Sequence, residues 1–183
     1  EKDNKLKAWG HKNLGGNVPS DISNVKLISN NRYSSAVLTK DGFVYAWGKT
    51  EFGGNLTQDL SGVINLFATE KAFCALKTNG TVYCWGDSNS GGTTPTLTNV
   101  VNVFNNKNAF TALISDGTLH SWGTINGTVP TSNNFIDIFS TNDGFTGIKG
   151  DGTVESWGSS NNAINTPPTD ISNVSMVFSN DNA

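Results

Sequence analysis

The five tryptophans of the chain recur at a nearly constant distance, and this period limits the folds that the chain can adopt. They are Trp9, Trp47, Trp85, Trp122 and Trp157, each followed by glycine, with spacings of 38, 38, 37 and 35 residues. Such a period is typical of repeat architectures, in which each repeat buries its apolar face against its neighbours. The repeat therefore determines the fold class more strongly than any single motif does.

Each repeat contains three short segments that have the pattern of a β-strand. The first is an apolar alternation, found as VKLIS from Val25, VINLF from Val63, VVNVF from Val100, FIDIF from Phe135 and VSMVF from Val174. The second is a small apolar run such as FCAL, which ends at Leu76, and the third follows a turn, as in NGTVYCWG from Asn79. An Asp-Gly or Asn-Gly step between two such runs is the strongest short hairpin signal. No segment has a sustained helical period.

These segments predict an all-β protein, a β-propeller of about five short three-stranded blades. Three-stranded units of this length cannot bury a face alone, and stacking them around an axis is the usual solution. We expect a single repeat domain over residues 1–183. Its repeats are expected at 10–47, 48–85, 86–122, 123–157 and 158–183, the last completed by residues 1–9.

Two stretches carry a resemblance to a known family. They are AVLTKDGFVYAWGKTEFGG at 36–54 and CALKTNGTVYCWGDSNSGG at 74–92, and each has a glycine pair six residues after its tryptophan. This pattern resembles the regulator of chromosome condensation repeat, a β-propeller family. Its short period is similar to that of the β-lactamase inhibitory protein of type II, whose blades also have three strands. Family propellers usually close with seven blades, so a segment of a larger seven-bladed propeller is the alternative.

The repeats also depart from this pattern. The glycine pair stands at Gly15-Gly16, Gly53-Gly54 and Gly91-Gly92, but TINGT and SSNNAIN replace it in the last two repeats.

The two ends of the sequence correspond to nearby positions of the repeat. NDNA at the end aligns with NKNA at 106–109, and EKDN at the start aligns with ISDG at 114–117. We therefore expect the termini to share the fifth blade, in which the positions equivalent to 110–113 are absent. The absent piece is a middle strand, so two backbone edges would be open. Open edges are templates for pairing with another chain.

The tryptophans and the two cysteines are expected to be structural. One large aromatic residue at the same place in every blade is explained by packing, so all five tryptophans are assigned to the core. Counting back across the Asn-Gly turn places Cys74 directly opposite Cys84. We favour a disulfide between them, with a free buried pair as the alternative. A disulfide indicates an oxidising compartment.

Composition excludes some partners. The net charge is −3 and the only arginine is Arg32, so there is no basic stripe for nucleic acid. No stretch approaches the roughly 20 apolar residues that span a bilayer, and we expect no membrane insertion. The expected location is extracellular or on a cell surface, where N-linked glycosylation sequons can be used. Four sequons are present, at Asn55, Asn79, Asn126 and Asn173.

No catalytic site is expected. Asp41, Asp116 and Asp151 stand at hairpin turns, where aspartate bonds its own backbone. His120 is expected to point outward on a third strand and has no repeated serine or aspartate partner. The cysteines and histidines lack zinc-binding spacing, and the loops lack calcium-binding spacing. We therefore predict that the protein is not an enzyme and has no metal and no cofactor.

Candidate binding residues stand in the turns between first and second strands, where the repeats differ from one another. The resemblance implies that binding members of the family present aromatic side chains from these turns. The candidates on this loop face are Arg32, Tyr33, Lys71, Asn108 and Asp143. The series Phe73, Phe110 and Phe145 recurs too regularly for a specific partner and is assigned to packing.

These observations predict a non-catalytic extracellular structural or adhesive module. It would assemble with copies of itself, as a filament or surface layer, or bind other surface proteins. The first alternative is a soluble protein-binding or inhibitor module that uses loops on one propeller face. The second is a carbohydrate-binding or hydrolytic propeller, for which His120 and Asp116 are the residues to test.

Overall fold

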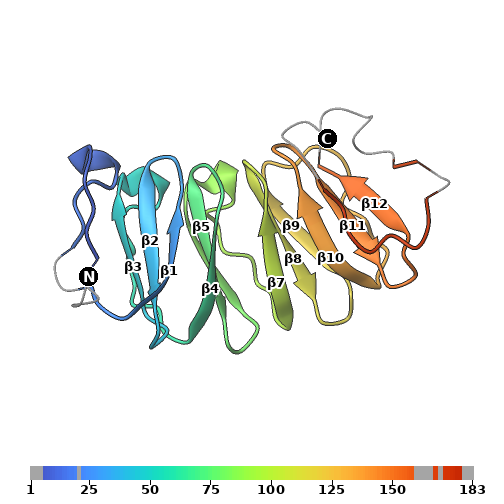
Figure 1. The fold of residues 1–183 in the computed structure, drawn as a ribbon, viewed down its shortest axis with the longest axis horizontal. Helices are drawn as coiled ribbons and strands as arrows, with labels where there is room; N and C mark the ends of the chain where they lie inside the picture. Colours follow the sequence, from blue (N-terminus) through green and yellow to red (C-terminus); the bar gives the residue numbers. More distant parts are fainter. Residues whose placement is uncertain (1–5, 20–21, 159–166, 169–170, 179–183) are drawn as a thin grey trace. The chain divides into compact units, whose positions relative to one another are not determined.

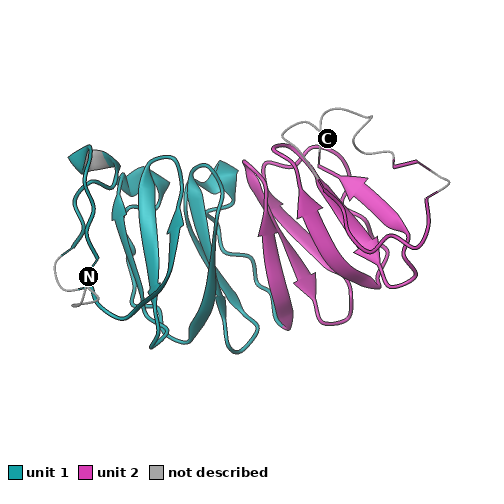
Figure 2. Cartoon of the chain, viewed as in Figure 1, with its two compact units in different colours: residues 1–98 teal, residues 99–183 magenta. Residues whose placement is uncertain are grey.

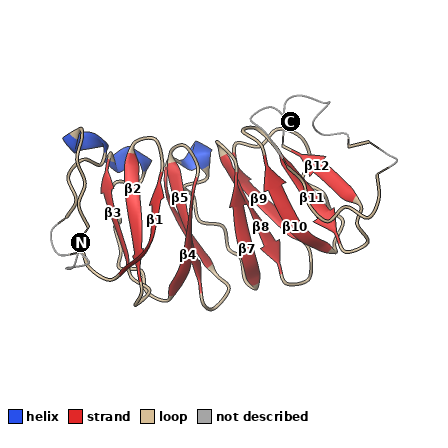
Figure 3. Cartoon of the chain, in the orientation of Figure 1, coloured by secondary structure: helices blue, strands red, loops and turns tan. Residues whose placement is uncertain are grey.

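The computed structural model describes residues 6–19, 22–158, 167–168 and 171–178, and these residues form β-sheets joined by turns (Figures 1 and 3). Four antiparallel sheets of three strands follow one another along the chain, and in every sheet the strands pair in sequence order. The prediction of an all-β fold made of three-stranded blades is confirmed. The described part contains no helix long and apolar enough to cross a membrane.

The chain divides into two compact units, residues 1–98 and 99–183 (Figure 2). The first unit contains blade 1, made of β1 (Val25–Asn30), β2 (Ser34–Thr39) and β3 (Val44–Gly48), and blade 2, made of β4 (Val63–Ala68), β5 (Ala72–Lys77) and β6 (Val82–Gly86). The second unit contains blade 3, made of β7 (Val100–Asn105), β8 (Ala109–Ile114) and β9 (Leu119–Gly123), and blade 4, made of β10 (Phe135–Ser140), β11 (Phe145–Lys149) and β12 (Val154–Trp157). The described part of the first unit also contains three short 3₁₀ helices, η1 (Lys12–Leu14), η2 (Thr50–Phe52) and η3 (Ser88–Ser90).

Consecutive blades within each unit are joined by a repeated backbone hydrogen bond. The residue that begins the first strand of a blade donates its N–H to a glycine carbonyl of the preceding blade. This glycine lies in the turn between the second and third strands of that blade. Val63 donates to Gly42 over 3.2 Å in the first unit, and Phe135 donates to Gly117 over 3.1 Å in the second. These glycines have φ near 80°, which glycine adopts without steric cost. The turn that closes one hairpin therefore also positions the next blade.

Phenylalanine–tryptophan pairs lie in the core of three blades, stacked in blades 2 and 4 and tilted in blade 3. The ring centroids lie 5.3 Å apart in Phe73–Trp85, 5.5 Å in Phe110–Trp122 and 5.6 Å in Phe145–Trp157. All three phenylalanines are buried, in accord with a packing role. Trp47, Trp85 and Trp157 are buried, and Trp122 is half-buried.

Trp9 departs from the expected core, because its side chain is 88% exposed. In three repeats a phenylalanine twelve residues before the tryptophan packs against the indole ring, and no described residue covers Trp9 in this way. Trp47 also lacks this phenylalanine, but it packs against Ile22 and Val37 instead. The assignment of Trp9 to the core is therefore corrected.

The glycine pair is required by a close contact within the loop that follows each third strand. A side chain added at Gly54 would place its Cβ 2.3 Å from the backbone carbon of Gly48, the glycine that follows Trp47. A Cβ added at Gly16 would lie 2.5 Å from the backbone of Gly10, and one added at Gly92 would lie 2.4 Å from the backbone of Gly86. The second glycine of the pair thus lets the chain fold back onto the Trp-Gly step.

The expected fifth blade falls largely outside the described residues. Of its first segment, Val174 donates a backbone hydrogen bond to Gly152 over 3.0 Å, as Val63 does to Gly42 and Phe135 does to Gly117. The described residues 171–178 contain no β-strand. The blade that the two termini were expected to share stays a prediction.

Candidate functional site

Aromatic and cationic side chains gather in the first unit, where turns of blades 1 and 2 come together. Tyr33 lies in the β1–β2 turn and Phe52 ends η2, and their ring centroids are 4.5 Å apart. Lys49 Nζ lies 4.6 Å from the Phe52 centroid, and Lys71 Nζ, from the β4–β5 turn, lies 5.7 Å from it. Arg32 Cζ lies 5.6 Å from the Tyr33 centroid. We call these five residues the cation–aromatic cluster.

Asn31 joins the two turns that carry the aromatic rings. Its Oδ1 accepts hydrogen bonds from the backbone N–H of Tyr33 over 2.8 Å and of Ser34 over 2.7 Å. Its Nδ2 donates to the carbonyl oxygen of Phe52 over 2.7 Å. The backbone N–H of Lys49 donates to the carbonyl oxygen of Tyr33 over 3.1 Å. The rings therefore stand on loops whose backbones are fixed before any partner binds.

The cluster carries more positive than negative charge. Arg32 Nη1 lies 2.7 Å from Glu70 Oε1, and the Arg32 backbone N–H donates to the Glu70 carbonyl oxygen over 3.1 Å. This hydrogen-bonded carboxylate raises the pKa of Arg32, so the guanidinium stays charged. Lys49 and Lys71 add two further cations. Their positions over the aromatic rings are those of cation–π contacts.

The structure brings together three of the five candidate residues that the sequence indicates, namely Arg32, Tyr33 and Lys71. Asn108 and Asp143 lie in the corresponding turns of the second unit. There the backbone N–H of Asn108 bonds the side chain of Asn106 over 2.9 Å, and that of Asp143 bonds the hydroxyl of Thr141 over 3.4 Å. Their place on a binding surface stays a prediction.

Sequence reasoning missed Lys49 and Phe52, which complete the cluster. Both follow the second Trp-Gly step, and the same positions in the next repeat hold Asp87 and Ser90. Comparison of the repeats along this loop, and not only along the turns between first and second strands, would have shown the change to a cation and an aromatic ring.

Cys74 and Cys84 lie opposite one another on β5 and β6, buried and present as thiols. The N–H and carbonyl of Cys84 both bond the hydroxyl of Thr94, over 2.8 and 3.0 Å. These groups therefore point away from β5, which makes the cysteines a non-hydrogen-bonded pair, the closer of the two antiparallel pair types. Burial, and then the hydrogen bond with Cys84, raises the pKa of Cys74 well above its ordinary value. The disulfide stays a prediction.

The turn aspartates bond their own hairpins. Asp116 Oδ1 accepts hydrogen bonds from the hydroxyl and the N–H of Thr118, over 2.6 and 2.9 Å. Asp151 does the same with Thr153, over 2.7 and 2.9 Å. The hydroxyl first and the N–H second lower the pKa of each carboxyl. His120 lies with its ring 6.1 Å from that of Trp122. Within the described part, no three His, Cys, Asp or Glu side chains gather as metal ligands would.

Comparison with known proteins finds a match for one repeat and similar structures for the fold. Residues 63–91 match the family model of the Regulator of chromosome condensation (RCC1) repeat. No curated protein matches the sequence. The resemblance to the β-lactamase inhibitory protein stays a prediction.

Solved structures similar to this chain have low sequence identity. The ectodomain of the receptor kinase CR4 from Physcomitrella patens is 18% identical with a TM-score of 0.59, over 80% of this chain and 41% of that chain. Yeast RCC1 (Prp20), bound to Kap60, is 16% identical with a TM-score of 0.57, over 77% and 45%. Prp20p from Saccharomyces cerevisiae is 19% identical with a TM-score of 0.54, over 80% and 46%. The matched region is thus less than half of each of these chains. Residues 63–91 of the present chain therefore resemble an RCC1 repeat, and its fold is that of the RCC1-like β-propellers.

Proposed function

We propose that this chain is a non-catalytic protein-binding module and that the cation–aromatic cluster is its binding surface. The observation that carries the proposal is the convergence of two aromatic rings and three cations from separate turns onto one site. Aromatic residues and arginine are enriched where proteins bind one another and contribute most of the binding energy there. The hydrogen bonds of Asn31 lower the cost of ordering this surface on binding.

The charge of the cluster indicates an acidic partner. Carboxylates form charge-assisted hydrogen bonds with Arg32 and the two lysines, and these bonds are stronger than neutral ones. The half-buried rings of Tyr33 and Phe52 add apolar contact for a neighbouring side chain. Protein binding also agrees with what is described for structures similar to this chain, since yeast RCC1 is bound to Kap60 and Prp20p has binding properties toward Gsp1p and histones.

Selection from a random peptide library tests this function. The library is screened against the wild-type chain and against the double variant Lys49→Asp, Phe52→Ser, which takes the residues of the next repeat, Asp87 and Ser90. We expect the wild type to enrich peptides rich in Asp and Glu, and the variant to lose them.

The matched control is the double variant Lys40→Asp, Phe43→Ser. It makes the same chemical change in the β2–β3 turn, at the other end of blade 1, where both side chains are exposed. The control is expected to enrich the same peptides as the wild type. Equal enrichment by all three proteins, or no preference for acidic peptides, would contradict the proposed site.

An extracellular location is part of this proposal. All four sequon asparagines, Asn55, Asn79, Asn126 and Asn173, are exposed. The paired geometry of Cys74 and Cys84 suits a disulfide, which forms in oxidising compartments. Among the similar structures is a receptor kinase ectodomain. Expression through a secretory pathway, followed by glycosidase treatment, should shift the mass of the protein; an unchanged mass and two free thiols would argue for another compartment.

Self-assembly into a filament or surface layer is the second candidate function. It is supported by Trp9 and Phe178, which are each 88% exposed. Exposed rings of this size are typical of surfaces that other chains cover, and a strand of a second copy would bury them. Electron microscopy over a concentration series tests this candidate. Fibres that disappear in the Trp9→Ser variant are expected, whereas single particles at every concentration would contradict it.

A further inference from the structure

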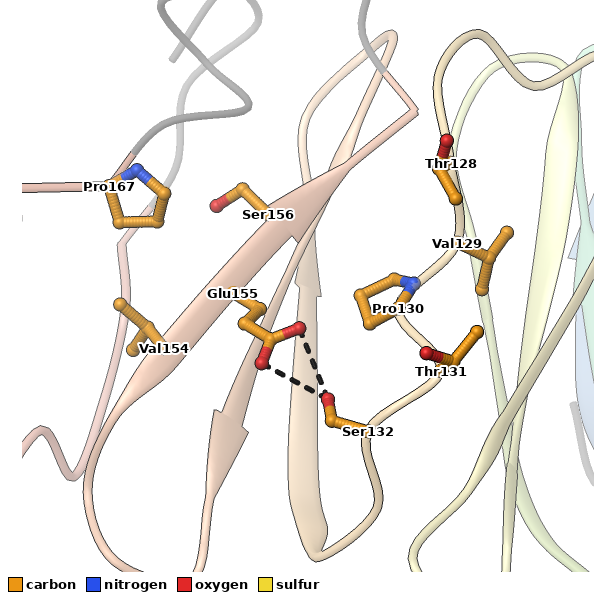
Figure 4. A pocket seen from close by; sticks show the side chains of 9 residues that line it. All are labelled: Thr128, Val129, Pro130, Thr131, Ser132, Val154, Glu155, Ser156 and Pro167. Atoms are coloured by element: carbon orange, nitrogen blue, oxygen red, sulfur yellow. Dashed lines mark hydrogen bonds between the residues drawn. The ribbon is translucent and has the colours of Figure 1, made fainter.

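We propose that a cavity in blade 4 binds a neutral sugar residue. The cavity has a volume of about 480 Å³ and lies between β12 and the connection that leads from β9 to β10 (Figure 4). Sites for small molecules usually measure about 300–1,000 Å³. Its lining consists of hydroxyl-bearing, apolar and acidic side chains: Thr128, Val129, Pro130, Thr131, Ser132, Val154, Glu155, Ser156 and Pro167. This site is separate from the cation–aromatic cluster and does not rest on the proposed protein-binding function.

The cavity arises at a place where blade 4 lacks an aromatic ring. Two residues before the tryptophan, blade 2 has Tyr83 and blade 3 has His120, and each ring lies 6.1 Å from the ring of its tryptophan. Blade 4 has Glu155 at this position. Its carboxylate is directed toward the connection opposite, where both oxygens accept from the hydroxyl of Ser132 over 3.1 Å (Figure 4). The space beside β12 is therefore left open to a ligand.

The negative charge of Glu155 in the cavity wall is balanced by a neighbouring lysine. Lys149 Nζ forms an ion pair with Glu155 Oε1 and lies 5.4 Å from the ring centroid of Phe135, and its side chain is only 17% exposed. A charged ligand would have to compete with this pair, whereas a neutral ligand leaves it intact. An ionised carboxylate has about four lone-pair sites, so Glu155 can accept further hydrogen bonds from ligand hydroxyls.

The remaining side chains fit the two kinds of surface that a sugar ring presents. The hydroxyls of Thr128, Thr131 and Ser132 can donate to and accept from ligand hydroxyls. The rings of Pro130 and Pro167 offer apolar surface to ring C–H groups on the two sides of Glu155 (Figure 4). The geometry supports binding only, because Glu155 is the single carboxylate in the lining and glycosidases use a pair. His120 and Asp116 do not line this cavity.

The test is saturation-transfer NMR of the full chain with methyl glycosides of glucose, galactose, mannose and N-acetylglucosamine. At least one glycoside is expected to receive signal from the wild type. Glu155→Tyr restores the aromatic residue of blade 2, fills the cavity and should abolish the signal. Glu155→Gln keeps the shape but loses charge-assisted acceptors, and we expect the dissociation constant to rise about tenfold. Glu51→Gln, on η2, is the matched control and should bind as the wild type does.

Three results would overturn this inference. The first is that no methyl glycoside binds the wild type. The second is that Glu155→Tyr binds as well as the wild type, which would place any binding elsewhere. The third is stronger binding of glucosamine or glucuronate than of the neutral glycosides, which would assign the cavity to charged ligands.

Discussion

The indole Nε1 of Trp85 donates a hydrogen bond of 3.0 Å to the carbonyl oxygen of Gly53, and thereby joins the core of blade 2 to the loop that follows blade 1. Trp47 makes the equivalent bond to Gly15 over 2.8 Å. In both cases the acceptor is the first glycine of a glycine pair. The repeat before Trp157 has lost this pair, and the buried Nε1 of Trp157 has no hydrogen-bond partner among the described residues. The indole N–H at this repeated position therefore has an acceptor in blades 1 and 2 but none among the described residues in blade 4.

Replacing each of these tryptophans by phenylalanine should separate the hydrogen bond from the packing. Trp85→Phe removes the donor and leaves the Gly53 carbonyl unpaired, so we expect a loss of about 1–3 kcal/mol in the free energy of unfolding beyond the loss of ring area. Trp157→Phe removes the same ring area and an unpaired donor, and should cost at least about 1 kcal/mol less. Urea unfolding measures both. Equal costs would show that the Trp85 bond adds no net stability.

Phe135 and Gly147 are expected to be energetically coupled. A Cβ added at Gly147 would lie 2.6 Å from Phe135 Cδ1, and the equivalent pair in blade 2 is Val63 with Ala75. Gly147→Ala should cost about 1–3 kcal/mol through overpacking, and Phe135→Val should cost a similar amount through the cavity that it leaves. The double variant has the residue pair of blade 2. Its loss in the free energy of unfolding should be about 0.5–3 kcal/mol smaller than the sum of the two single losses. Additive losses in a double-mutant cycle would refute this coupling.

The two cysteines should form a disulfide under oxidising conditions. In the equivalent pairs of blades 3 and 4, the hydroxyl oxygens of Thr111 and Ser121, and of Thr146 and Ser156, lie 2.7 Å apart, so side-chain atoms at these positions meet. Non-reducing mass spectrometry after exposure to oxidised glutathione should show the loss of two hydrogens and a bridged peptide pair. Recovery of two alkylatable thiols after unfolding would contradict the bridge.

The reduced protein should lose stability at alkaline pH. The folded pKa of Cys74 is above its unfolded value, so the thiol's contribution is complete below the unfolded pKa of about 8.5 and is lost as the pH rises beyond it. Urea unfolding in the presence of a reductant measures this loss. The variant Cys74→Thr, Cys84→Ser takes the residues of blade 3 and should remove this part of the pH dependence. An unchanged alkaline slope in the variant would assign it to other groups.

Asp116 and Asp151 should contribute to the loss of stability in acid. Their folded pKa values are below the unfolded value of about 3.9, so their contribution is present above that pH and is lost as the pH falls through the folded pKa. The double variant Asp116→Asn, Asp151→Asn has the residue of the 79–80 turn and keeps an acceptor that does not titrate. Its urea midpoint should fall less than that of the wild type between neutral and acidic pH. If the urea midpoint falls equally in the variant and in the wild type, these two carboxyls do not contribute to the loss of stability in acid.

Much of the fold can be predicted from the sequence because the repeats supply internal comparisons. The Asn-Gly turn and the matched small residues place Cys74 opposite Cys84, and the structure has this register. The prediction for Trp9 is wrong because burial of the tryptophan depends on side chains of a middle strand that pack on its ring, such as Phe73 on Trp85 and Val37 on Trp47, and not on the Trp-Gly step itself. A motif therefore identifies the strand, whereas neighbours in space determine burial.

The candidate site was less predictable for a related reason. Arg32 and Tyr33 are visible in the sequence as variations of one turn, but Phe52 meets Tyr33 only because Asn31 holds the carbonyl oxygen of residue 52, twenty-one residues away. The cavity beside Glu155 was missed as well. The exchange of an aromatic residue for glutamate is visible in the aligned repeats, but the space that it opens depends on the facing connection around Ser132.

Calorimetric titration of one selected acidic peptide decides whether the cation–aromatic cluster binds protein. The peptide is titrated into the wild type, the Lys49→Asp, Phe52→Ser variant and the Lys40→Asp, Phe43→Ser control. We predict that the cluster variant binds at least about tenfold more weakly, which corresponds to about 1.4 kcal/mol, and that the control binds like the wild type. Wild-type affinity should also fall as salt is raised, because the contacts are partly ionic and exposed. Equal affinities of all three proteins would place protein binding outside the cation–aromatic cluster.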